Sequence, residues 1–84
     1  MEKTKHDFTL ALTGISALDE RVLDALFEAG CDDATPSVRS GRVYLTFSRR
    51  ADSMKDAILS AISDVDKAQV GAQVIRVERS NHHE

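Results

Sequence analysis

The sequence predicts an α+β domain in which a strand followed by a helix occurs twice, about 35 residues apart. In each unit, apolar residues first alternate with smaller or polar ones, as on a half-buried strand, and then recur at helical spacing. The repeat predicts the class of the fold but no chemistry. The apolar positions of the first unit are Phe8, Leu10, Leu12, Leu18, Val22, Ala25 and Leu26, and those of the second are Val43, Leu45, Phe47, Met54, Ile58, Ala61 and Ile62.

The first unit is expected to comprise a strand over residues 7–13 and a helix over about residues 17–29. Ser16 followed by Asp19 resembles a capping box, because a hydroxyl can accept from the first free amides of a helix and a carboxylate favours its positive end. Gly30 suits the left-handed residue that ends many helices. The helix is therefore predicted to begin just after Ser16 and to end before Gly30.

Two strands joined by a tight turn are expected next. Residues 35–39 form the first of them, and Pro36, which has no amide donor, fits best at the start of a strand or at a sheet edge. Ser40 and Gly41 separate it from a strand over residues 42–48. Such a short link is typical of a β-hairpin.

The second unit ends the chain with a helix and a strand. Ser53 and Asp56 repeat the capping pattern, and an apolar stripe runs from Met54 to Val65. Residues 68–71 are expected to form a turn that leads into a last strand over residues 72–79.

This order of elements predicts a ferredoxin-like βαββαβ sandwich, with two helices on one face of a four-stranded antiparallel sheet. Right-handed crossovers would place the first and third strands in the centre and the second at an edge. We expect one domain over residues 7–79, with a flexible N-terminus at 1–6 and a flexible tail at 80–84. Because this fold hosts many unrelated functions, it predicts little about what the protein does.

Composition and length favour a small cytoplasmic domain. The 84 residues, 42% hydrophobic and 30% charged, can bury one core, and no apolar run reaches the length of a membrane span. The charged start of the chain, followed by an alternating pattern, argues against a signal peptide. Cys31 is the one cysteine and cannot form an internal disulfide, which fits a reducing compartment.

Charged residues are sorted between the expected strands and helices. Acids dominate the helices and the loop after the first helix, whereas arginines gather on the strands and at their ends. The helical side is therefore expected to be acidic and the sheet side basic, although the net charge is only −3. Such sorting suggests a charged partner, while the simpler interpretation is ordinary solvation of exposed positions. The strand arginines are Arg39, Arg42, Arg49, Arg50, Arg76 and Arg79.

Strand phase predicts which residues face away from the helices. If Phe8 points inward, Thr9, Ala11 and Thr13 point outward, as do the alternate residues of the third strand. This outward face carries a single aromatic residue, so it resembles a protein-binding surface more than an RNA-binding sheet. The residues expected to form the interaction surface are Ala11, Tyr44, Thr46, Val74 and Arg76.

No catalytic or cofactor motif stands out. Cys31 precedes two aspartates, whose charge would raise the pKa of a thiol rather than lower it, so a small packed residue is the simpler interpretation. His6, His82 and His83 lie near the chain ends without the spacing of a metal site. We therefore predict no catalytic residues, no cofactor and no metal, and a protein that is not an enzyme.

Four segments carry a resemblance to a known group of proteins: residues 24–33, 41–47, 57–65 and 74–78. Together they look like an uncharacterised family of small bacterial α+β proteins, over about residues 7–79. The family resembles the N-terminal domain of helix-turn-helix regulators or antitoxin-like proteins. This chain ends at Glu84, where the DNA-binding segment of the longer relatives would begin. The resemblance implies a sensing or association module and no catalytic residues.

Three hypotheses for the function remain open. The leading one is a non-enzymatic interaction or regulatory module, dimeric through its sheet face or edge, in a regulatory, antitoxin-like or phage-defence-related system. The second is an ACT-like sensor of small ligands that uses the turn of Gly14, Ile15 and Ser16. The third is a weak nucleic-acid-binding domain that uses Arg42, Arg49 and Arg50.

Overall fold

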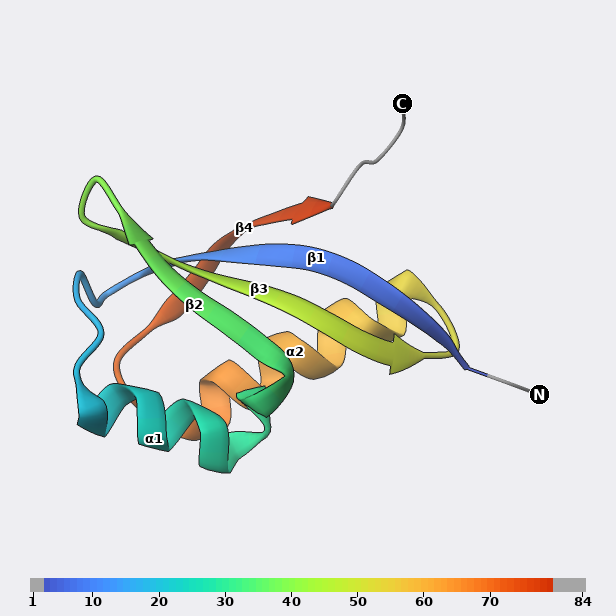
Figure 1. The fold of residues 1–84 in the computed structure, drawn as a ribbon, viewed down its shortest axis with the longest axis horizontal. Coiled ribbons are helices and arrows are strands. Elements are labelled where there is room, and N and C mark those ends of the chain that lie inside the picture. Colours follow the sequence, from blue (N-terminus) through green and yellow to red (C-terminus); the bar gives the residue numbers. More distant parts are fainter. Residues whose placement is uncertain (1–2, 80–84) are drawn as a thin grey trace.

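The computed structural model describes residues 3–79, in which four strands form one antiparallel sheet and two helices cover one of its faces (Figure 1). The order of the strands across the sheet is β2-β3-β1-β4. The elements in chain order are β1 (Thr4–Thr13), α1 (Glu20–Ala29), a 3₁₀ turn η1 (Cys31–Asp33), β2 (Ala34–Arg39), β3 (Arg42–Ala51), α2 (Met54–Ala68) and β4 (Gln73–Arg79).

The predicted α+β class, the four-stranded antiparallel sheet and the two helices are confirmed. As expected, β1 and β3 lie in the centre, and β2, which contains Pro36, lies at an edge. The predicted boundaries were less accurate. β1 begins at Thr4, inside the segment expected to be flexible, and β3 continues to Ala51. The predicted tail at 80–84 lies outside the described residues.

The start of α1 differs from the prediction. Asp19, not Ser16, is the N-cap residue, and its carboxylate accepts a hydrogen bond of 2.9 Å from the amide of Val22. The side chain of an N-cap residue accepts from a free amide of the first turn, and a carboxylate can do this as well as a hydroxyl. Asp19 is therefore the N-cap of α1. The prediction for α2 is confirmed, because the Ser53 hydroxyl accepts from the amide of Asp56 at 3.1 Å.

The core lies between the sheet and the helices and is built on the central strand pair. Phe8 of β1 lies directly opposite Phe47 of β3, and their rings stack with centroids 5.3 Å apart. Helix α2 contributes small residues, so its backbone can approach the sheet closely. The fully buried side chains include Phe8, Leu10, Leu12, Leu26, Cys31, Val43, Leu45, Phe47, Ala57 and Ala61.

Gly30 ends α1 in the left-handed conformation that the sequence predicted. Its φ is 119°, and its amide donates to the carbonyls of Leu26 and Phe27. A Cβ atom at this position would lie 2.6 Å from a carboxylate oxygen of Asp64 on α2. The glycine therefore permits both the end of α1 and its close approach to α2.

We expect Gly30→Ala to destabilise the protein more than Gly41→Ala. Both glycines have positive φ, which costs an alanine about 1 kcal/mol, but a Cβ atom at Gly41 meets no atom within 4 Å. Urea unfolding of the two variants should give a lower free energy of unfolding for Gly30→Ala. Equal decreases in the free energy of unfolding would contradict this, because they would show that Asp64 moves away from the added methyl group at no cost.

Candidate functional site

One face of the sheet is not covered by helices, and the strand register defines which residues lie on it. We call this surface the bare face. Its residues alternate along each strand with the buried ones, since successive side chains point to opposite sides of a sheet. They are Lys5, Asp7, Thr9, Ala11 and Thr13 of β1, Thr35, Ser37 and Arg39 of β2, Arg42, Tyr44, Thr46, Ser48 and Arg50 of β3, and Gln73, Arg76 and Glu78 of β4.

At the centre of the bare face, side chains of neighbouring strands contact one another. Ala11 lies between Tyr44 on β3 and Arg76 on β4, and it is fully buried although no helix covers it. The hydroxyls of Thr9 and Thr46 are 3.1 Å apart, at hydrogen-bond distance. The bare face thus brings together four of the five residues predicted to form an interaction surface: Ala11, Tyr44, Thr46 and Arg76.

The fifth predicted residue, Val74, faces the opposite way. It lies opposite Leu12 and packs against the core, so its assignment to the interaction surface is wrong. The cause is a register shift between Ala11 and Leu12, where β4 has one extra residue. Simple alternation places Val74 and Arg76 on one face, whereas the bulge places them on opposite faces.

The bare face carries more cations than acids. Its cations are Lys5, Arg39, Arg42, Arg50 and Arg76, and its acids are Asp7 and Glu78. Both acids are partnered within the face: Asp7 accepts from the Ser48 hydroxyl at 2.9 Å, and Glu78 pairs with Arg76 at 2.9 Å. The Arg39 guanidinium lies over the Tyr44 ring, 4.7 Å from its centroid.

Arg49 is not on this face, which corrects the hypothesis that it contacts nucleic acid. Arg49 is two residues after Phe47 on β3, so both side chains point toward the helices. The Arg49 side chain is only 11% exposed. Its Nε and Nη2 donate to the two carboxylate oxygens of Asp33 at 2.7 and 2.9 Å. Nη2 also donates to the carbonyl of Gly30 at 2.7 Å, and Nη1 lies 3.0 Å from Asp64.

The surroundings of Arg49 keep it charged. The hydrogen bonding that the guanidinium donates to Asp33 is the main cause of its raised pKa, against the opposing effect of burial. Asp33 therefore has a structural role as the carboxylate partner of Arg49. The sequence does contain a signal for this role: an arginine at an inward position of a strand needs an acidic partner when it is buried.

We expect Arg49→Met to lower the free energy of unfolding by about 2–3 kcal/mol. The substitution keeps the apolar stem but leaves Asp33 and Asp64 without their cation, and the partial exposure of both carboxylates moderates the loss. Arg50→Met, at the exposed neighbouring position, is the matched control and should change stability by less than about 0.5 kcal/mol. Urea denaturation measures both, and similar values for the two variants would contradict a structural role for Arg49.

A small polar pocket lies at the end of the sheet, beside the bare face. Its volume is about 210 Å³, and it lies between the β1–α1 turn and the β2–β3 hairpin. The structure here joins two sets of predicted residues, because Arg42 lines the same pocket as Gly14, Ile15 and Ser16. Within residues 3–79, Arg42 has no carboxylate partner.

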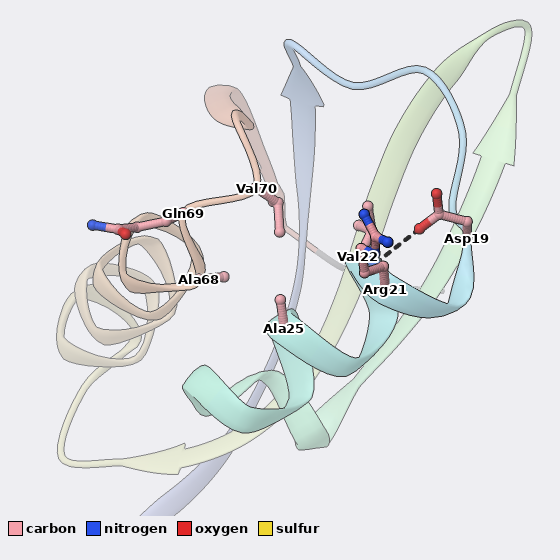
Figure 2. A pocket seen from close by; sticks show the side chains of 7 residues that line it. All are labelled: Asp19, Arg21, Val22, Ala25, Ala68, Gln69 and Val70. Carbon is pink, nitrogen blue, oxygen red and sulfur yellow. Dashed lines mark hydrogen bonds between the residues drawn. The ribbon is translucent and has the colours of Figure 1, made fainter.

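A second pocket, of about 310 Å³, lies between the start of α1 and the end of α2 (Figure 2). Ala25 and Val70 face the space between the helices, while the Gln69 side chain points away from it. Asp19 lies at the edge, with its carboxylate engaged in capping α1. Four of its seven lining residues are apolar, and the other three are Asp19, Arg21 and Gln69.

Cys31 is fully buried in η1. Burial, and then the charge of Asp64, raise the pKa of its thiol to about 11. At neutral pH the thiol is therefore protonated, whereas a nucleophilic cysteine needs a thiolate.

The other features considered in the sequence give no further site within residues 3–79. Here no group of three or more histidine, cysteine or acidic side chains could hold a metal ion. His6 lies on β1, near the carbonyl of Ala51, whereas His82 and His83 lie outside the described residues. No helix in this range is long and apolar enough to cross a membrane.

Comparison of the chain with models of known families, with curated proteins and with solved structures finds no match.

Proposed function

We propose that the protein is a non-enzymatic interaction module that binds an acidic surface of a protein partner through the bare face. The observation that supports this is the charge of a face that no helix covers: five cations and two acids, of which Glu78 is paired with Arg76 and Asp7 is hydrogen-bonded to Ser48. The unpaired guanidinium and ammonium groups would attract and orient a partner of opposite charge. We further propose a regulatory role, which is what the bacterial family resemblance implies.

The fold proposed for this module is the ferredoxin-like sandwich. The βαββαβ order of the main elements supports it, as do the central position of β1 and β3 and the helices on one face. In this arrangement the uncovered face of the sheet is a natural binding surface, because it is broad, rigid and supported by a packed core.

A protein partner fits the bare face better than a nucleic acid. Sheets that bind single-stranded RNA stack bases on two or three aromatic rings, whereas this face has Tyr44 alone. One side of that ring is already occupied by Arg39. Arg49, which was expected to contact phosphates, is turned toward the helices. Small side chains such as Thr9 and Thr46 leave the centre flat, as in many protein interfaces.

The test is affinity capture from an extract of the native host with nuclease-treated and untreated samples. We expect a stoichiometric protein partner that Tyr44→Glu loses, since the substitution puts an acid at the centre of the basic face. Phe27→Glu, at an exposed apolar position of α1, is the matched control and should retain the partner. Circular dichroism should show that both variants are folded.

Two results would contradict this function. A partner that is retained by Tyr44→Glu but lost by Phe27→Glu would place binding on the helices. A bound nucleic acid whose affinity falls steeply with salt would instead support the third hypothesis.

A second candidate, a sensor of small ligands, is supported by the polar pocket. Arg42, Thr13 and Ser16 are among the residues that line it, and the pocket is large enough for a small carboxylate or phosphate ligand. A thermal-shift screen of amino acids and nucleotides tests this candidate. A ligand that raises the melting temperature of the wild type, but not of Arg42→Gln, would support it, and a screen without such a ligand would exclude it at the concentrations used.

A further inference from the structure

The two edges of the sheet differ in how well they can accept another strand. At one edge, β2 contains Pro36, which has no amide hydrogen to donate. At the other edge, β4 has neither proline nor glycine between Gln73 and Arg79. Proteins commonly block exposed edges with proline or inward-pointing charges, because an unblocked edge pairs with other chains. β4 has a bulge at Ile75, a feature that can also protect an edge, but residues 76–79 pair regularly with β1 and leave that part of the edge open to another strand.

β4 also exposes apolar surface at this edge. The extra residue at the bulge is Ile75, and its side chain is 49% exposed. It is one of the few large apolar side chains at the surface of the described residues. A strand laid along β4 would remove part of this area from water and would satisfy the free peptide groups of the edge.

The charges of β4 indicate which strand fits. Arg76 and Glu78 both lie on the bare face, two residues apart, with Val77 between them on the helical side. If two copies of β4 pair antiparallel about a two-fold axis at Val77, Arg76 of each copy lies directly opposite Glu78 of the other. Moving the axis by one residue places Arg76 opposite Arg76, or Glu78 opposite Glu78. The charges therefore favour the register with its axis at Val77 and disfavour the registers shifted by one residue.

We propose that β4 pairs with β4 of a second copy of this chain, antiparallel and centred on Val77. The two four-stranded sheets would form one continuous sheet of eight strands, with both bare faces on the same side. The proposal stands on the edge of the sheet and not on the function proposed for the bare face, so either can fail without the other.

The first experiment exchanges the charges and measures mass by light scattering. The wild type should have twice the 9.2 kDa mass of the chain. Arg76→Glu alone and Glu78→Arg alone each place like charges opposite one another and should weaken the dimer about tenfold or more. An equimolar mixture of the two variants restores opposite charges at every position and should give a heterodimer. Loss of folding cannot produce this rescue.

A cross-link tests the register directly. Cys31 is fully buried, whereas Val77 is partly buried on the helical side of β4, and the two-fold axis would bring the thiol of Val77→Cys opposite its copy. Cα atoms of opposite residues in antiparallel strands lie within the range of a disulfide. Mild oxidation should link Val77→Cys into covalent dimers much faster than Thr35→Cys, the exposed control on β2.

Three results would overturn the proposal. A wild type that is monomeric at all concentrations excludes the dimer. Dimers that persist unchanged in both single charge variants indicate another interface. A mixture that stays monomeric, or cross-linking of Thr35→Cys as fast as of Val77→Cys, excludes the register.

Discussion

The ion pairs of Arg49 connect the sheet to the helical layer beside the hydrophobic core. This one side chain extends from the inward side of β3 and contacts the end of α1 at Gly30, the 3₁₀ turn at Asp33 and the C-terminal part of α2 at Asp64. Such an arginine is stable inside only because its donors are satisfied by carboxylates and a carbonyl. The glycine at the end of α1 is required by the same contact, since Asp64 lies where a larger residue would place its Cβ atom.

This arrangement gives the two sides of the protein different charges. Carboxylates gather on the helical side, where Asp33 and Asp64 neutralise Arg49, whereas the cations of the sheet, such as Arg42 and Arg50, are left on the bare face. The net charge of the chain is negative, so the basic face is a local feature and not a consequence of composition. A surface that opposes the overall charge can orient a partner before contact. This is the physical basis for proposing that the bare face binds.

Much of the fold could be predicted because hydrophobic periodicity is local. The alternation around Phe8 and Phe47 and the turn residues between elements were sufficient for the class, the central strands and the caps at Gly30 and Ser53. The site was less predictable because it depends on contacts between distant segments. The bulge that reverses Val74 leaves no mark in the sequence, and the role of Arg49 depends on carboxylates that the fold brings to it. The polar pocket is a further example, because Arg42 and the turn at Gly14 line it together although they are far apart in the sequence.

We propose that the bare face, and not the helical layer, recognises an acidic partner. Titration of the ¹⁵N-labelled protein with a glutamate-rich peptide, followed by amide chemical shifts, tests this most directly. We expect shifts that concentrate on β1 and β3 around Ala11, Tyr44 and Thr46, and that disappear at high salt because the attraction is electrostatic. Shifts confined to α1 and α2, or no shifts at any peptide concentration at low salt, would contradict it.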